Sequence, residues 1–206
     1  MYRLPVARDI GDMNGLYALK PWYAARLSGV RALLVTHGVH PSAITVAGIV
    51  FGAAAGAVLG LGETGPWAAV AVAAALAGRL ACANLDGGVA RDGGRSTRFG
   101  AVVNELGDRL AEYAALAGCL ALADPALVAA AALAATLPSW AALAGAAAGA
   151  RRPQGGPVGK TERCALLVLL ALTGWTGWLI ALAAGSLLTA VVRITRVHRE
   201  LREATS

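Results

Sequence analysis

Apolar residues occur in long runs along this chain, separated by short segments rich in polar residues, glycine and proline. The runs cover residues 45–61, 67–86, 99–123, 126–150 and 163–194. A helix needs about 20 apolar residues to cross the hydrocarbon core of a membrane. The last run is too long for one crossing, and Gly174-Trp175-Thr176-Gly177 near its middle predicts a turn between two shorter helices. The pattern therefore predicts six membrane-spanning helices.

The segment before the first run has a different pattern. Between Lys20 and His40, apolar residues recur at helical spacing with arginines between them, which predicts an amphipathic helix at the membrane surface. A helix packed on the rest of the domain explains the same pattern. His40-Pro41-Ser42 then breaks the chain and starts the first apolar helix. Residues 1–20 carry charges and no clean apolar core, so we expect no signal peptide there.

We therefore expect an all-α fold, namely a polytopic membrane bundle of six transmembrane helices preceded by an amphipathic juxtamembrane helix. The expected divisions are an N-terminal cytoplasmic and juxtamembrane segment (1–40), a transmembrane domain (41–198) and a cytoplasmic tail (199–206). Glycines 52, 56 and 60 recur every fourth residue in the first span, which predicts close packing of that helix against a neighbour.

Composition agrees with a membrane domain. Of the 206 residues, 57% are hydrophobic and 15% are charged, and the mean hydropathy is +0.61, which excludes a disordered chain. The abundance of alanine, glycine and arginine is typical of a GC-rich bacterial genome. The three cysteines lie in apolar runs and are expected to be small core side chains.

The formal net charge of +6 would suggest nucleic-acid binding in a soluble protein. Here the basic residues gather in alternate segments: the N-terminal segment, 87–98, 151–161 and the tail. The turns between them, at 62–66, 124–125 and 174–177, contain no Lys or Arg. Because cytoplasmic loops of membrane proteins are enriched in Lys and Arg, this alternation places both termini in the cytoplasm. It also removes the reason to expect a nucleic-acid partner.

Polar side chains cluster at the cytoplasmic side of the second and third spans. Asn104, Asp108 and Glu112 are spaced four residues apart and share one helix face, with Glu105 beside them. Asp86 ends the preceding span, and one short loop joins the two helices, so we expect these groups to be neighbours. Ionisable groups inside a membrane are costly and usually functional. Carboxylates beside arginines suit a hard cation together with a phosphate.

A structural interpretation of the same acids remains open. Arg79 lies within the second span and Arg109 follows Asp108, so the acids are also able to pair with these arginines inside the bundle.

The order of these residues resembles a known signature. From Asp86 the chain reads Asp86-Gly87-x-x-Ala90-Arg91, eight residues, Gly100, three residues, Asn104, three residues and Asp108. This resembles the CDP-alcohol phosphotransferases (CDP-alcohol phosphatidyltransferases), whose pattern is D-x-x-D-G-x-x-A-R, eight residues, G, three residues, D, three residues, D. Six of the eight fixed positions match, and the first and third aspartates fall on Ala83 and Asn104. The sequence resembles a divergent bacterial member with a relaxed motif.

The resemblance implies a transferase of phospholipid biosynthesis in the cytoplasmic (inner) membrane. It would move a phosphatidyl group from a CDP-alcohol, expected to be CDP-diacylglycerol, to a small acceptor alcohol and release CMP. It implies a homodimer, Mg²⁺ or Mn²⁺ as cofactor, and Asp108 as general base. The implied metal ligands are Asp86, Asn104, Glu105 and Asp108. The implied neighbours of the cytidine diphosphate are Gly87, Ala90, Arg91 and Gly100.

The basic residues near the cytoplasmic side have two interpretations. Arg151, Arg152, Lys160, Arg163 and the arginines of the tail are expected mainly to set the topology. Some of them would instead bind an anionic acceptor such as an inositol or glycerol phosphate. Arg193 and Arg196 lie where the last helix reaches the cytoplasm, so they are the candidates for acceptor binding.

Two other functions stay open. A non-catalytic relative, acting as a membrane scaffold or partner subunit, would explain the replacement of two motif aspartates by Ala83 and Asn104. A small transporter or channel would also contain buried charges. The chain shows no repeat between its halves, and its polar groups gather at one end, which disfavours transport.

Overall fold

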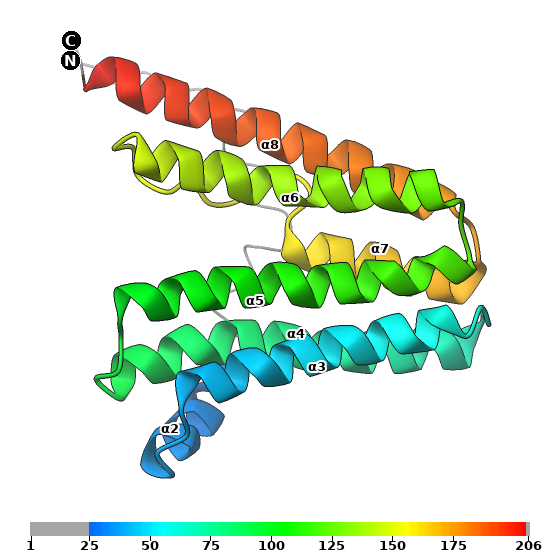
Figure 1. Cartoon of the computed structure of the whole chain (residues 1–206), viewed down its shortest axis with the longest axis horizontal. Helices are drawn as coiled ribbons and strands as arrows, with labels where there is room; N and C mark the ends of the chain where they lie inside the picture. Colours follow the sequence, from blue (N-terminus) through cyan, green and yellow to red (C-terminus); the bar gives the residue numbers. More distant parts are fainter. Residues whose placement is uncertain (1–24, 205–206) are drawn as a thin grey trace, which may run out of the picture.

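The computed structural model describes residues 25–204, and this part of the chain is helical with no strand (Figure 1). Residues 1–24 and 205–206 lie outside the described part of the chain. The predicted juxtamembrane helix, between Lys20 and His40, therefore lies partly outside it. The helices are α2 (Ser28–Thr36), α3 (Pro41–Gly60), α4 (Pro66–Asp92), α5 (Arg98–Ala117), the short 3₁₀ helix η3 (Gly118–Ala121), α6 (Pro125–Ala147), α7 (Lys160–Thr173) and α8 (Gly177–Glu203).

Proline and a capping residue fix the starts of two long helices. His40 accepts a hydrogen bond from the Ser42 backbone N–H at 3.2 Å, and Pro41 begins α3. Asp124 accepts from the N–H groups of the two residues after Pro125, which begins α6. Proline suits the first helical turn because the backbone N–H that it lacks would have no hydrogen-bond acceptor within the helix. The predicted helix starts are confirmed at both places.

The predicted turn inside the last apolar run is also confirmed. Helix α7 ends at Thr173, and Gly174 has a φ of +68°, in the left-handed region that favours glycine. Helix α8 then begins at Gly177.

Two helices run further than the apolar pattern indicated. Helix α4 continues past Asp86 to Asp92, because Val89 is buried in a cluster that includes Leu34 of α2 and Ile44 of α3. The segment from 87 therefore has an apolar face despite its glycines and arginines. Helix α8 continues to Glu203, well beyond Ile194, because residues 195–203 contain neither glycine nor proline.

Among residues 25–204, four helices are long and apolar enough to cross a membrane by length and composition: α3, α4, α6 and α8. The chain is therefore a membrane-embedded protein. Of the other two expected spans, α5 carries several charged residues, and α7 has only 14 residues. The expected count of six spans stays a prediction.

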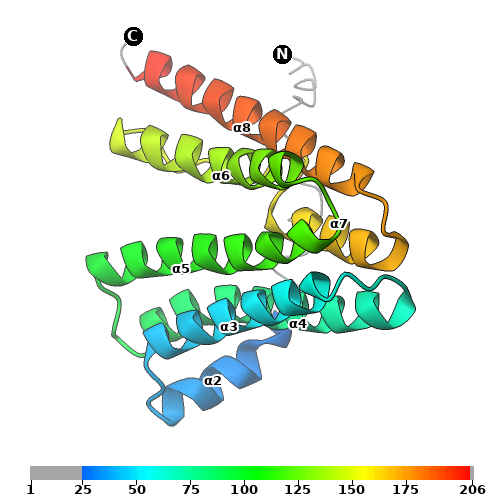
Figure 2. The same cartoon turned by 45° about the vertical axis from the view of Figure 1, so that its right-hand side comes forward.

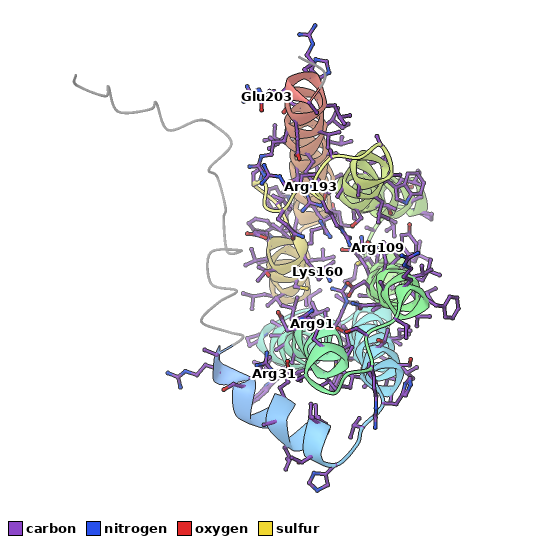
Figure 3. The ribbon with its side chains drawn as sticks, turned by 90° about the vertical axis from the view of Figure 1, so that its left-hand side faces the viewer. Arg31, Arg91, Arg109, Lys160, Arg193 and Glu203 are labelled. Atoms are coloured by element: carbon purple, nitrogen blue, oxygen red, sulfur yellow. The ribbon has the colours of Figure 1, made fainter. Side chains whose placement is uncertain are left out.

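The six longer helices lie side by side with their axes running in the same general direction (Figures 1 and 2). Helix α3 packs on α4 and α5, α6 packs on α8, and α7 packs on both α4 and α8. Viewed from one end, α7 lies between the α3–α4–α5 group and the α6–α8 pair (Figure 3).

Helix α2 lies along the flank of the α3–α4–α5 group and contacts α4 (Figure 3). Arg31 forms an ion pair with Asp92 at 2.8 Å, while Val30 and Leu33 remain exposed. The helix thus packs on the domain and still presents apolar side chains outward.

Glycines hold α3 close to α5. A Cβ atom at Gly52 would overlap the backbone of Ala111, and one at Gly56 would overlap the carbonyl oxygen of Ala114. At Gly60 the nearest atom would be 3.9 Å away, so that position has room for a methyl group. The predicted close packing is confirmed at the first two positions. The three cysteines are buried and free, as expected for core side chains.

Candidate functional site

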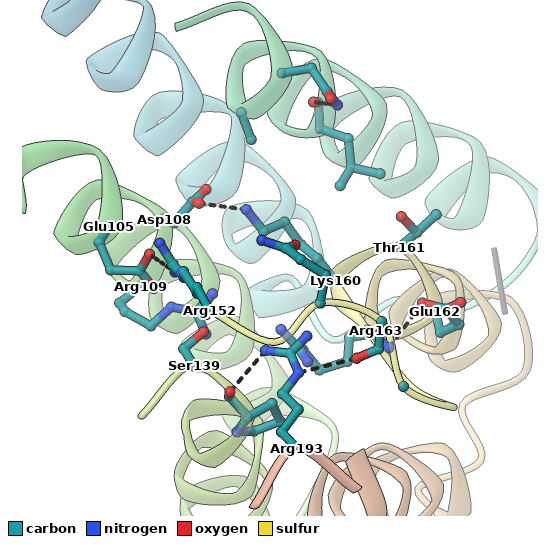
Figure 4. A pocket seen from close by; sticks show the side chains of 18 of the residues that line it. Glu105, Asp108, Arg109, Ser139, Arg152, Lys160, Thr161, Glu162, Arg163 and Arg193 are labelled. Carbon is teal, nitrogen blue, oxygen red and sulfur yellow. Dashed lines mark hydrogen bonds and ion pairs between the residues drawn. The ribbon is translucent and has the colours of Figure 1, made fainter. Parts of the chain in front are cut away.

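A cavity of about 360 Å³ opens between α5, α7 and the loop that joins α6 to α7 (Figure 4). Its wall includes residues of α4, α6 and α8 as well, so both halves of the chain build it. Its charged and polar lining residues are Asn84, Glu105, Asp108, Arg109, Ser139, Arg152, Gln154, Lys160, Thr161, Glu162, Arg163 and Arg193. Five of these side chains are basic and three are acidic, so the cavity suits an anionic ligand.

Asp108 lines this cavity and carries an ion pair. Its Oδ2 atom lies 2.5 Å from Nζ of Lys160, the first residue of α7 (Figure 4). The backbone carbonyl of Asp108 accepts a hydrogen bond from the buried Arg79 at 3.1 Å. The expected general base on α5 is thus contacted by two basic side chains, Arg79 of α4 and Lys160 of α7.

Glu112, one helical turn further along α5, has a different environment. It is buried and accepts hydrogen bonds from Arg109 and from Arg163, the latter at 2.6 Å. Both arginines are buried too. The interpretation that the acids pair with arginines inside the bundle therefore holds for Glu112, with Arg163 as a partner that the sequence did not indicate.

Asp86 lies near this group but does not line the cavity. It is buried, and it accepts hydrogen bonds from the Thr45 hydroxyl at 3.2 Å and from the Gly87 N–H at 2.6 Å. A Cβ atom at Gly107, the residue before Asp108, would overlap the same Thr45 side chain. Thr45 of α3 therefore lies against the segments of α4 and α5 that carry the two remaining motif aspartates.

The other two expected metal ligands are placed differently. Glu105 lines the cavity and forms an ion pair with Arg152 at 2.5 Å. Oδ1 of Asn104 is buried, and it has no hydrogen-bond partner among the described residues.

These donors limit the metal that the site fits. Among residues 25–204, no group of three or more His, Cys, Asp or Glu side chains is arranged to hold a metal ion. What remains are two carboxylates, Asp86 and Asp108, and the unpaired oxygen of Asn104. Mg²⁺ in such sites is bound by one or two carboxylates and completes its shell with water and substrate phosphates. Asp86, Asp108 and Asn104 therefore carry oxygen atoms of the type that a hard cation prefers.

The expected nucleotide-binding residues lie at neighbouring helix ends, outside the cavity. Gly87, Ala90 and Arg91 occupy the last turns of α4, and Gly100 lies in the first turn of α5. A Cβ atom at Gly87 would lie 3.3 Å from the Arg91 guanidinium, so that side chain folds over the glycine. Their role in binding the nucleotide stays a prediction.

Arg193 and Arg196 have different positions. Arg193 lines the cavity, and its guanidinium donates to the carbonyls of Gly155 at 3.1 Å and Pro138 at 2.8 Å (Figures 3 and 4). Arg196 donates to the carbonyl of Gln154 and does not line the cavity. Arg152, Lys160 and Arg163, expected mainly as topology signals, all line the cavity and pair with acids of α5. The basic loop at 151–161 was the sequence signal that pointed to Arg152 and Lys160, and Arg163 lies just after that loop.

Comparison with known proteins agrees with this arrangement. A family model described as CDP-alcohol phosphatidyltransferase matches residues 38–194. A crystal structure of the Mycobacterium tuberculosis phosphatidylinositol phosphate synthase in complex with manganese and citrate is similar at 25% identity and a TM-score of 0.65, covering 82% of this chain and 88% of that one. A structure of the same synthase with CDP-DAG bound is similar at 25% identity and a TM-score of 0.58, covering 84% and 90%. The comparison with curated protein sequences gave no match.

Proposed function

Because the chain belongs to the CDP-alcohol phosphatidyltransferase family, we propose that it transfers a phosphatidyl group from CDP-diacylglycerol to a small acceptor alcohol and releases CMP. The observation that carries the proposal is the position of Asp108, a motif carboxylate in the wall of a basic cavity. The similar synthase with CDP-DAG bound supports the choice of donor.

The reaction is a displacement at the phosphorus that carries the lipid. Asp108 takes the proton from the acceptor hydroxyl, and the oxygen attacks that phosphorus. The bond to the phosphate of CMP breaks, and CMP leaves with the electron pair. Phosphoryl transfer depends mainly on positioning and on neutralising charge, and the cavity supplies both through its basic side chains.

A bound Mg²⁺ or Mn²⁺ would neutralise charge on the diphosphate, and Asp86, Asp108 and Asn104 are the residues that would hold it. The manganese complex of the similar synthase supports this cofactor. Gly87, Ala90, Arg91 and Gly100 would border the cytidine diphosphate at the ends of α4 and α5.

We propose that the acceptor carries a negative charge of its own, as a phosphorylated polyol does. Arg152, Lys160 and Arg193 line the cavity beside Asp108, which would place the anionic group near the base. The similar synthase is named for a phosphatidylinositol phosphate product and was solved with citrate, a small anion. Arg196 would hold the loop at Gln154 that forms part of the wall.

The proposed setting is the cytoplasmic membrane of a bacterium, with six spans, both termini in the cytoplasm and two copies of the chain in a homodimer. The acyl chains of the donor would remain in the lipid while its headgroup enters the site from the cytoplasm.

The test is CMP release by the purified protein in nanodiscs. It uses CDP-diacylglycerol, Mg²⁺ or Mn²⁺, and glycerol 3-phosphate, inositol phosphate or serine as acceptor. We expect one phosphorylated acceptor to support release, and we expect Asp108→Asn and Asp86→Ala to abolish it. Glu63→Gln, in the exposed turn between α3 and α4, is the matched control and keeps activity.

If no acceptor supports release and CDP-diacylglycerol does not raise the Tm, the transferase proposal fails and a non-catalytic scaffold or partner subunit replaces it. A raised Tm without turnover would show that the donor site is intact and that the proposed class of acceptor is wrong.

A further inference from the structure

The site has lost two of the carboxylates that its family pattern contains. The first and third aspartates of that pattern fall on Ala83 and Asn104. Ala83 lines the cavity on the α4 side, so a metal-binding oxygen is absent from that wall. Each replacement removes one negative charge and one donor for a hard cation.

A basic side chain lies against the motif aspartate that remains on α5. Lys160 belongs to the start of α7, which is outside the motif and 52 residues from Asp108. Its Nζ lies 2.5 Å from Oδ2 of Asp108. The ammonium group is therefore close enough to neutralise a carboxylate that a divalent cation would otherwise neutralise.

The surrounding charges leave little attraction for further cations. Arg79 is buried beside this group and donates to the backbone carbonyl of Asp108. The charge of Asp108 is thus opposed by those of Lys160 and Arg79. A second divalent ion would lie among fixed positive charges, and the nearby Glu105 and Glu112 are already paired with arginines.

We propose that Lys160 acts as a built-in cation in place of one divalent metal ion. In the free protein it neutralises Asp108. The inference concerns the free protein and stands apart from the proposed function.

The inference is tested by counting Mn²⁺ ions on the purified protein in nanodiscs without substrate, using the electron paramagnetic resonance signal of free Mn²⁺. We expect the wild-type chain to bind at most one ion. Lys160→Met should tighten Mn²⁺ binding by about tenfold or more, because it removes a positive charge that contacts Asp108, a proposed ligand of the ion. Lys160→Arg keeps the charge and should keep the wild-type affinity.

A triple variant extends this test. Lys160→Met combined with Ala83→Asp and Asn104→Asp restores the full carboxylate pattern, and we expect it to bind two ions. The Tm of each variant shows whether it is folded. Two ions on the wild-type chain would overturn the inference, and so would an unchanged affinity in a folded Lys160→Met variant.

Discussion

Glu112→Gln is the most direct test of the forces that hold the bundle together. The side chain of Glu112 is only 5% exposed, and it accepts hydrogen bonds from the buried Arg109 and Arg163. The substitution keeps the shape of the side chain and removes its charge. Two guanidinium groups are then left inside the bundle without a carboxylate between them.

The expected cost follows from this burial. Removing one partner of a buried ion pair costs about 3–5 kcal/mol, because the remaining charge stays desolvated. For a chain of this size, each kcal/mol lowers Tm by roughly 2–4 °C, so the expected loss is about 6–20 °C.

The assay is thermal unfolding in one detergent, followed by circular dichroism at a helical wavelength. Glu105→Gln is the matched control, because its partner Arg152 is 45% exposed and such pairs contribute about 0–1 kcal/mol. A Tm for Glu112→Gln within 2 °C of the control would refute the reasoning, since it would mean that water already solvates Arg109 and Arg163.

Three further outcomes are expected. Gly56→Ala should lower Tm by a few degrees, as its Cβ would overlap the backbone of α5 at a cost of about 1–3 kcal/mol, whereas Gly60→Ala has room and should leave Tm unchanged. Gly174→Ala should cost about 1–2 kcal/mol in the same unfolding assay, because the residue ends α7 in a left-handed conformation. Arg193→Met should raise the KM for the anionic acceptor by about tenfold or more and leave the KM for CDP-diacylglycerol unchanged, since its guanidinium lines the cavity; equal rises in both constants would contradict that assignment.

Local chemistry made much of the fold predictable. Proline after a capping residue marks the starts of α3 and α6, and glycine marks the turn between α7 and α8, so these boundaries follow from the sequence alone. The end of α4 did not follow, because Gly87 and Gly88 favour a loop. Burial of Val89 against α2 and α3 outweighs that preference, and burial is a tertiary effect.

The site was predictable only as far as the motif extends. Spacing along one helix placed Asp108 and Glu112 on a common face, but it did not separate their roles. That separation comes from α7, whose first turn directs Lys160 to Asp108 and Arg163 to Glu112. Which residues of a distant helix meet a given carboxylate depends on the register between helices, and no local pattern encodes that register.

The pairing of Glu112 with Arg163 also bears on the order in which the chain is synthesised. Helices α5 and α7, which contribute this pair, are the two longer helices that do not meet the criteria of length and apolar composition for crossing a membrane. A ribosome completes α5 well before it reaches residue 163, so the nascent chain carries Glu112 with only Arg109 as its partner. The final environment of α5 is therefore available only after α7 has been made, and the biogenesis of these two helices is coupled through one ion pair.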